Sequence, residues 1–392
     1  MESYRDVTGA AAKRQPEMLK MIAELVGIES PTEDRAGVNR CVALVERWIK
    51  ASGGKSERSR QRTLGGTAGD LLVGRFGPAR NTVKPAVKPL MLLGHLDTVW
   101  PLSTLKKMPF RVRQGRAWGP GVLDMKAGVV MALGALRMLL DAGQLTRPVW
   151  LLLNSDEETG SQCSRALTES LARKCEAVFV LEPAQGIPGA YKTARKGVAN
   201  YHLRVHGVAA HSGVDFDRGH SAVLELGRQI ERASAFTDLA RGITVNAGVI
   251  GGGTRSNVVA AEAWAEFDVR IARAVDAKRM DRRFHSLRAV DRKCRLEISG
   301  GLNRPPMERT SGTVALFRRA ATMAAGLGFS LQEAATGGGS DGNFTSALGI
   351  PTLDGMGAVG EGAHASHESI LLDALVPRTA LLAAMIGGLS LQ

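Results

Sequence analysis

The sequence has few cysteines and no long apolar run, and its first residues do not predict a secretory leader. Its 4 cysteines among 392 residues show no Cys-x-x-Cys spacing, so no disulfide framework is predicted and we expect buried thiols in a reducing compartment. No apolar segment reaches the roughly 20 residues that a transmembrane helix needs, and residues 1–6 do not open a signal peptide. These absences predict a cytoplasmic protein without a membrane partner.

Acidic residues are outnumbered by basic ones, and aromatic residues are scarce. The chain carries 51 Lys and Arg against 38 Asp and Glu, a formal net charge of +13, with 5% aromatic residues. Such a charge would suit nucleic-acid binding, but the basic residues gather in residues 55–62 and 278–295, where Phe284 is the only Phe, Tyr or Trp. Without a stacking platform we expect a solvated basic helix face that attracts anionic substrates, and no nucleic-acid partner.

The length and the hydropathy pattern predict two α/β-type domains. A chain of 392 residues with 44% hydrophobic residues exceeds the usual size of one domain. Continuous apolar runs at 90–93, 149–153 and 177–181 have the length of strands buried on both faces, as in a mostly parallel sheet. From residue 198 the pattern changes to alternating strands at 198–205, 243–250, 263–271 and 294–298, with helices at 221–235 and 277–289. This β-α-β-β-α-β order is the ferredoxin-like arrangement of an α+β domain.

Residues with metal-binding chemistry follow each of the three apolar runs. Ligands of open α/β sheets bind at the carboxyl ends of the strands, so these residues are expected at one edge of one sheet. Two further candidates lie at the N-terminus of a helix expected over 125–140 and in a loop ahead of residues 370–372. In chain order the candidates are His95, Asp97, Asp124, Glu157, Glu158, Glu182 and His364.

Each candidate alone has a simpler explanation. A loop histidine can cap a strand, Asp124 can be a helix N-cap, and Glu157-Glu158 can be an exposed charged turn. Zinc accepts both imidazole nitrogen and carboxylate oxygen, and five such ligands exceed the needs of one tetrahedral ion. Two metal ions that share one bridging carboxylate would account for the set His95, Asp124, Glu158, Glu182 and His364.

The need for His364 at this site fixes the order of the domains along the chain. Residues 300–306 break the run of alternating strands, and the chain must then return to the first domain. The sequence therefore predicts a catalytic domain of residues 1–195 and 305–392, with a second domain inserted at 196–304.

Ordered motifs along the chain resemble those of the M20 family of di-zinc metallopeptidases and deacylases. The motifs are GHLDT at 94–98, GPGVLDMK at 119–126, DEETGS at 156–161, LEP at 181–183, TGGGSD at 336–341 and HASHE at 364–368. They cover essentially the whole chain, and the resemblance is greatest to the glutamate carboxypeptidase branch. One departure is Ala127, where the family often has Gly.

The resemblance implies a site for two divalent metal ions, most commonly zinc, with cobalt or manganese as alternatives. Asp124 would bridge the two ions, His95 and Glu182 would complete different metal sites, and Glu158 and His364 would be the remaining ligands. A cis peptide bond is implied between Asp124 and Met125. His367 is an alternative to His364, although the spacing of His364 to Glu368 fits the family better.

Two carboxylates are expected to act without binding metal. Asp97 would orient the imidazole of His95, as carboxylates behind ligating histidines commonly do. Glu157 would be the general base, which takes a proton from the metal-activated water and passes it to the leaving amine. Because Glu157 and Glu158 are adjacent, one can point at the metal while the other faces the substrate.

In the M20 family the inserted domain forms a lid and the dimer interface, so a homodimer is implied. The resemblance places substrate contacts at His211, Asn257 and Arg270 in this domain and at Gly338 in the glycine-rich segment. His211 would stabilise the oxyanion from the partner subunit, and Arg270 would bind a substrate carboxylate. Without the resemblance, His211 could equally be a plain loop residue and Arg270 an exposed charge at a strand end.

Together these features predict metal-dependent hydrolysis of an amide or peptide bond next to a free carboxylate, in a small peptide or N-acyl amino acid. The M20 family tends to have Glu at the position of Glu182 in carboxypeptidases and deacylases and Asp in aminopeptidases, so the resemblance implies a glutamate carboxypeptidase-like enzyme rather than an aminopeptidase. The alternative is an N-acyl amino acid deacylase of the acetylornithine or succinyl-diaminopimelate type. A binding protein on the same fold is disfavoured because all the metal and base positions are present.

Overall fold

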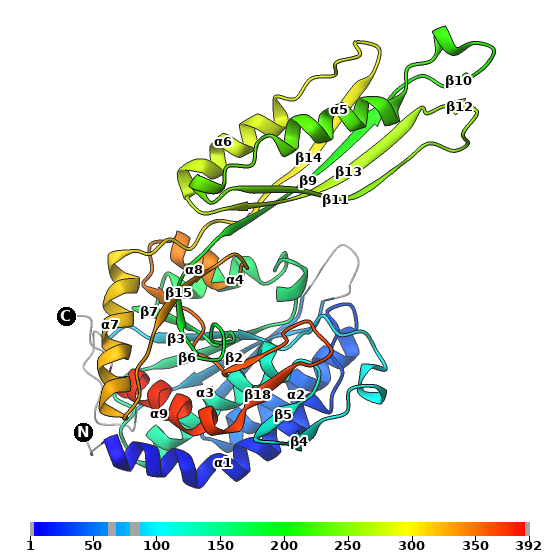
Figure 1. Ribbon diagram of the computed structural model, residues 1–392. Coiled ribbons are helices and arrows are strands. Elements are labelled where there is room, and N and C mark those ends of the chain that lie inside the picture. The colour runs from blue at the N-terminus through cyan, green and yellow to red at the C-terminus, as the bar shows by residue number, and fades with distance from the viewer. Residues whose placement is uncertain (1–3, 62–67, 79–86, 389–392) are drawn as a thin grey trace. The chain divides into compact units, whose positions relative to one another are not determined.

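The computed structural model describes residues 4–61, 68–78 and 87–388, and the chain divides into two compact units (Figure 1). The first unit comprises Met1–Ala194, Arg309–Thr336 and Ser340–Gln392, and the second comprises Arg195–Glu308 and Gly337–Gly339. Each unit has a hydrophobic core of its own. None of the helices among the described residues is long and apolar enough to cross a bilayer.

A six-stranded sheet forms the centre of the first unit. Its order is β1-β2-β6-β3-β7-β16, in which β6, β3, β7 and β16 run parallel while β1 and β2 are antiparallel to their neighbours. This mixed, mostly parallel sheet confirms the expected fold class. The strands are β1 (Lys55–Ser59), β2 (Leu71–Phe76), β3 (Leu90–His95), β6 (Val149–Asn154), β7 (Ala177–Val180) and β16 (Thr352–Leu353).

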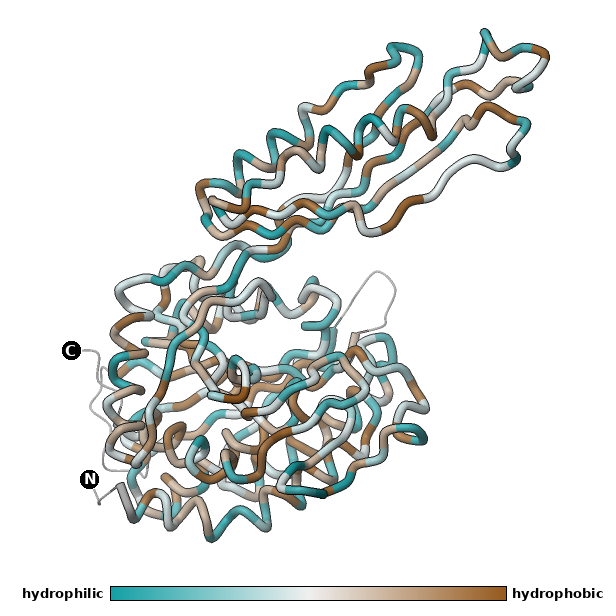
Figure 2. Tube along the Cα trace, in the orientation of Figure 1, coloured by the Kyte–Doolittle hydropathy of each residue, from teal (hydrophilic) through white to brown (hydrophobic). Residues whose placement is uncertain are grey.

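Both faces of this sheet are buried, which explains the continuous apolar runs. Leu90 and Leu92 of β3 belong to the large core under the helices, whereas Met91 and Leu93 belong to a smaller core on the other face. Figure 2 shows the hydrophobic residues gathered along these central strands. Because successive side chains of a strand point to opposite faces, a strand buried on both faces needs apolar residues at every position.

Three helices pack against one another on the large-core side of the sheet: α1, α3 and α9 (Figure 1). The helix α3 begins two residues later than expected, because an irregular turn at Val122–Lys126, with non-helical angles at Asp124 and Met125, precedes it. The helices of the first unit are α1 (Tyr4–Val26), α2 (Arg35–Ala51), α3 (Ala127–Asp141), α4 (Arg165–Ala172), α7 (Ser311–Gly326), α8 (Gly342–Ala347) and α9 (Leu372–Gly388).

Two small sheets complete the first unit. One has the order β17-β18-β5-β4 and joins segments from both halves of the chain, and the other pairs β15 with β8. Their strands are β4 (Arg111–Arg113), β5 (Arg116–Trp118), β8 (Tyr191–Arg195), β15 (Glu333–Thr336), β17 (Gly360–Glu361) and β18 (Ser369–Leu371). The first of these sheets holds the C-terminal loop that carries His364 against the segment before Asp124.

The second unit is an antiparallel sheet of order β11-β13-β9-β14 with α5 and α6 on one face, plus a short β10-β12 ribbon. The expected β-α-β-β-α-β order is observed, but α6 begins and ends earlier than expected. The strand β14 continues to Arg304 because it pairs along almost all of β9. The elements are β9 (Gly197–His206), β10 (Ala210–His211), α5 (Ala222–Ser234), β11 (Thr244–Gly252), β12 (Val258–Val259), β13 (Glu262–Ile271), α6 (Ala274–His285) and β14 (Arg295–Arg304).

Two glycines of the first unit permit close approach to one backbone carbonyl. A Cβ atom at Gly128, in the first turn of α3, would lie 2.2 Å from the oxygen of Leu181, and a Cβ at Gly357 would lie 2.2 Å from the same oxygen. Leu181 directly precedes Glu182. The absence of side chains at 128 and 357 therefore sets how closely the loop of Glu182 can approach α3.

We expect Gly128→Ala to destabilise the protein by about 1–3 kcal/mol, because a backbone oxygen cannot move away as a flexible side chain would. A matched control is Gly9→Ala in the exposed part of α1, where nothing lies within 4 Å of the added Cβ. There the gain in helix propensity should stabilise by about 0.5–1 kcal/mol. Urea unfolding of both variants measures the difference, and equal stabilities would contradict the close-approach argument.

Candidate metal centre

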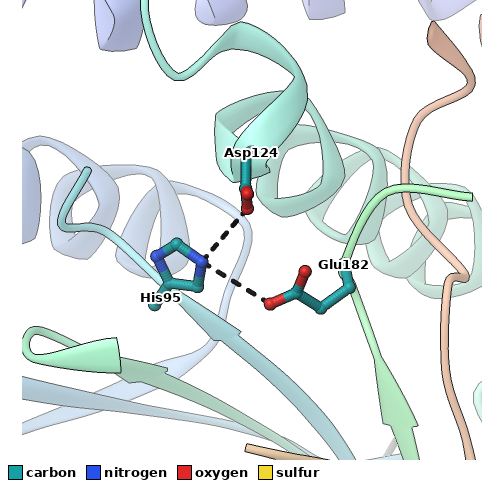
Figure 3. A group of neighbouring side chains, drawn as sticks. All are labelled: His95, Asp124 and Glu182. Carbon is teal, nitrogen blue, oxygen red and sulfur yellow. Dashed lines mark ion pairs between the residues drawn. The ribbon is translucent and has the colours of Figure 1, made fainter. Parts of the chain in front are cut away.

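Three side chains from separate elements of the first unit meet at the carboxyl edge of the main sheet (Figure 3). His95 is the last residue of β3, Glu182 follows β7, and Asp124 lies in the irregular turn before α3. The His95 Nε2 atom lies 3.4 Å from Asp124 Oδ1 and 3.6 Å from Glu182 Oε1. One ligand atom of each residue lies within 4.8 Å of the others, a spacing that suits a shared metal ion.

A second set of three shares Asp124 with the first. His364 Nε2 lies 3.2 Å from Asp124 Oδ2 and 3.4 Å from Glu158 Oε2. His364 sits in the loop between β17 and β18 with a φ of +63°, and Glu158 lies in a 3₁₀ turn, Glu157–Thr159, after β6. The two oxygens of Asp124 are thus directed at different imidazoles, as a carboxylate that bridges two ions would be.

Unpartnered buried atoms support the fit of this site to metal ions. Among the described residues, His95 Nε2, Asp124 Oδ1 and Glu158 Oε1 are buried without a hydrogen-bond partner. Buried polar atoms in proteins are nearly always partnered, and imidazole nitrogen with carboxylate oxygen is a donor set that zinc accepts. The residues present therefore fit two ions that share Asp124.

The pKa values of the two ligand sets are shifted because carboxylates lie close to both imidazoles. Burial by itself lowers the pKa of His95, but the carboxylates of Asp124, Asp97 and Glu182 raise that pKa well above its usual value. Asp124 and Glu158 raise the pKa of His364 to about 10. Burial favours the neutral form of Asp124, yet His364 and His95 hold its pKa below the usual range, and burial raises the pKa of Glu158 to about 6. The site thus favours positive charge at the positions of the imidazole protons.

Asp97 contacts His95 and stays outside both ligand sets. Its Oδ1 lies 3.4 Å and its backbone oxygen 3.0 Å from Nδ1 of His95, on the ring edge opposite the Nε2 that faces Asp124. The carboxylate also accepts hydrogen bonds from the backbone N–H groups of Glu157 and Glu158, at 3.4 and 3.2 Å. Asp97 therefore links the orientation of one candidate ligand to the turn that carries another.

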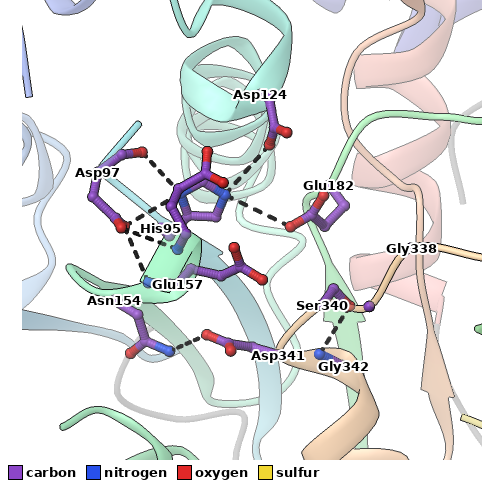
Figure 4. A network of polar contacts seen from close by, with 12 residues as sticks. His95, Asp97, Asp124, Asn154, Glu157, Glu182, Gly338, Ser340, Asp341 and Gly342 are labelled. Carbon is purple, nitrogen blue, oxygen red and sulfur yellow. Dashed lines mark hydrogen bonds and ion pairs between the residues drawn. The ribbon is translucent and has the colours of Figure 1, made fainter. Parts of the chain in front are cut away.

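Glu157 occupies the start of that turn, half-buried and outside both ligand sets (Figure 4). The ends of the segment are tied to Asp341: its Oδ2 accepts a hydrogen bond from Asn154 Nδ2 at 2.6 Å, and its Oδ1 accepts one from the Ser161 hydroxyl. Asp341 thus holds both ends of the turn and Asp97 holds its backbone. In this conformation Glu158 lies in a ligand set and the adjacent Glu157 lies outside it.

Several residues around the site were not found from the sequence. Thr32 donates a hydrogen bond from its hydroxyl to Asp97 Oδ2 at 2.7 Å, although 65 positions separate the two residues. Asp341 and Glu368 stood within recognised motifs but received no role, and only the folded chain shows which loops they contact. The implied cis bond between Asp124 and Met125 is present, and His367 is exposed and lies outside both ligand sets.

The four expected substrate-binding residues all lie in the second unit. His211 and Asn257 are neighbours at the β10-β12 ribbon, where Ser212 N donates to Asn257 O at 3.1 Å. Arg270, on β13, holds both oxygens of Asp268 through Nε and Nη2 at 2.7 and 2.8 Å. Gly338, placed in the first domain by the sequence, groups with the second unit, and its carbonyl accepts from Arg195 Nη1 at 3.1 Å.

Comparison with known proteins identifies the family of the chain. Residues 91–387 match the peptidase family M20/M25/M40. Carboxypeptidase G2 of Pseudomonas sp. (strain RS-16) is 29% identical over 383 residues, 96% of this chain and 90% of the relative. Succinyl-diaminopimelate desuccinylase of Acidovorax ebreus (strain TPSY) is 26% identical, with coverages of 92% and 94%. The fold resembles that of aminopeptidase PepT from Bacillus cereus ATCC 10987, with a TM-score of 0.74 and 21% identity over 95% of this chain and 98% of that one.

The family match extends over most of the chain, from β3 to α9, and includes every residue of the two ligand sets. The chain therefore belongs to peptidase family M20/M25/M40 and is a metal-dependent hydrolase of peptide or amide bonds.

Proposed function

We propose that this protein is a carboxypeptidase-type hydrolase that releases an amino acid, with glutamate the first candidate, from a small peptide or N-acyl amino acid. The observation that carries the proposal is Asp124, whose two oxygens face separate imidazoles, His95 and His364. We assign His95, Asp124 and Glu182 to one metal ion and Asp124, Glu158 and His364 to the other. Carboxypeptidase G2, similar over nearly the whole chain, supports the choice of a carboxypeptidase.

Two bound divalent ions, zinc in our proposal with cobalt or manganese as alternatives, would supply a water acidic enough to ionise near neutral pH and would polarise the scissile carbonyl. The residues of the chain supply the rest. Glu157 takes the proton of the attacking water and later delivers it to the leaving amine. Asp97 holds the His95 ring through Nδ1, which keeps Nε2 directed toward the ligand set.

The second unit would supply the contacts to the substrate. His211 stabilises the oxyanion with help from Asn257, and the two are adjacent on one ribbon. Arg270 is proposed to bind the carboxylate of the substrate through the N–H groups that Asp268 does not use. The carbonyl of Gly338 is held by Arg195, which positions this part of the glycine-rich segment for the substrate backbone.

A deacylase is the second candidate. It is supported by the succinyl-diaminopimelate desuccinylase that is similar over 92% of this chain. Both reactions hydrolyse an amide beside a carboxylate and would use the same metal set. They differ in the leaving amine and the acyl group, so substrate preference distinguishes them.

The metal and the substrate can be tested together. We expect purified protein to bind two zinc ions per chain, because side chains of the described site supply both ligand sets. A chelator should remove the ions and abolish activity. A panel of N-acyl glutamates, C-terminal glutamate dipeptides, acetylornithine and succinyl-diaminopimelate measures the preference. Protein that binds no metal would refute the proposal, and preference for the last two substrates would favour the deacylase.

Glu157→Gln should lower kcat by about 100- to 10,000-fold, the range typical of a lost general base, with little change in KM. Metal content should stay at two ions per chain because Glu157 lies outside both ligand sets. Glu169→Gln, at a half-buried acid of α4 paired with Arg165, is a matched control that should keep full activity. Wild-type kcat in Glu157→Gln would exclude this residue as the base.

We propose that the second unit forms a homodimer through β11 and α5. β11 is an edge strand of its sheet, and apolar side chains of these two elements are exposed: Val223 (47%), Leu224 (58%), Val249 (49%) and Ile250 (64%). Contiguous exposed apolar residues mark interaction surfaces, and a two-fold dimer uses the same surface on both copies.

Leu224→Asp with Ile250→Asp should give a monomer by light scattering, whereas Val275→Asp, at an exposed apolar site of α6 (71%), should remain dimeric.

If His211 serves the partner's site, inactive His211→Ala and Glu157→Gln proteins should complement each other when subunits exchange. The mixture should reach about a quarter of wild-type activity, because half the dimers are mixed and each mixed dimer carries one intact site. A wild-type monomer, or no complementation after exchange, would contradict the proposed arrangement.

A further inference from the structure

One fully buried carboxylate, that of Glu368, lies outside both ligand sets and contacts the loops around them. Its Oε2 accepts hydrogen bonds from the indole Nε1 of Trp100 at 2.7 Å and from the backbone N–H of Gly121 at 2.9 Å. Its Oε1 accepts hydrogen bonds from the N–H groups of Leu123 at 2.9 Å and Asp124 at 3.0 Å. Each oxygen therefore accepts two hydrogen bonds.

The loop that carries Asp124 depends on an outside acceptor for these N–H groups. Gly121 has a φ of +69°, and Asp124 and Met125 adopt non-helical angles, with φ of −111° and −133°. The first N–H groups of a helix have no acceptor within it, and an irregular backbone before the helix leaves more of them unpaired. The Glu368 side chain takes the place of the missing backbone acceptors.

Glu368 is itself held against this loop by the small sheet. Its backbone oxygen accepts from Gly119 N at 3.3 Å, and the next residue, Ser369, pairs with Trp118 of β5. His364 lies four residues before Glu368, and Trp100 lies three residues after Asp97. One carboxylate thus joins the three loops that carry Asp97, Asp124 and His364.

We propose that Glu368 is a positioning residue for the hydrolytic reaction. Three of its four hydrogen bonds, from the N–H groups of Gly121, Leu123 and Asp124, fix the loop of Asp124 so that each oxygen of that carboxylate meets its own ligand set. The inference rests on the proposed function, in which Asp124 bridges two ions. Glu368 acts through Asp124 and has no contact of its own with metal or substrate.

Glu368→Gln tests this role with almost no change of shape. Because each carboxylate oxygen accepts from two donors, either orientation of the amide directs its NH₂ group at two N–H groups that need an acceptor. We expect metal affinity to fall about 10- to 100-fold, as for other residues that orient ligands. At saturating metal, kcat should still fall while KM stays near the wild-type value, and the visible spectrum of the cobalt-loaded enzyme should change.

Two further variants make the test decisive. Trp100→Phe removes one of the four donors and should give smaller changes of the same kind in metal affinity and cobalt spectrum. Glu361→Gln, at an exposed acid of β17 that pairs with Arg116 at 2.8 Å, should leave both unchanged. If Glu368→Gln does not fold, Trp100→Phe decides the question alone.

Wild-type metal affinity, kcat and cobalt spectrum in Glu368→Gln would overturn the positioning role, as would an unaltered Trp100→Phe where Glu368→Gln is unfolded. Failure of the proposed function has a different signature. In that case the wild-type protein itself would bind no metal or hydrolyse none of the amide substrates.

Discussion

The carboxylate of Asp124, with one imidazole at each oxygen, is the contact on which the rest of the first unit depends. A buried anion is costly unless opposite charge and hydrogen bonds surround it. Here the surroundings come from distant parts of the chain. His95 comes from β3 and His364 from the C-terminal loop, and the carboxylate of Glu368 accepts a hydrogen bond from the backbone N–H of Asp124. The cis bond after Asp124 and the irregular turn before α3 are the local geometry of this arrangement.

The parallel sheet explains why the site lies where it does. β3, β6 and β7 run side by side and end at the same edge, so the residues that follow each of them must be close in space. These strands are buried on both faces, while the loops that follow them carry the candidate ligands. Because residues 128 and 357 are glycines, the backbone oxygen of Leu181, next to Glu182, can lie close to the backbone of α3 and of residue 357.

Both the strand pattern and the candidate ligands were readable from the sequence because they depend on local signals. A run such as Leu90–Leu93 indicates a buried strand, and a polar residue directly after it indicates the sheet edge. Helix α6 was misplaced by several residues because its bounds depend on tertiary contacts, among them Phe284 near its end, which packs into the core of the second unit. The length of β14 was underestimated because its pairing with β9 is a long-range contact.

The sequence by itself determined the fold class, the family and the residue types available for two metal ions, because hydropathy and motif order are properties of the chain. Only the tertiary structure decided that the two oxygens of Asp124 face different histidines, that Asp97 touches His95 as well as the turn of Glu157, and that the imidazole of His364 lies beside Asp124 and Glu158. The same holds for Glu368, which the sequence shows only as an acid near His364. Apart from the contact of Asp97 with His95, these contacts join residues tens to hundreds of positions apart, so their geometry exists only after the sheet has brought the loops together.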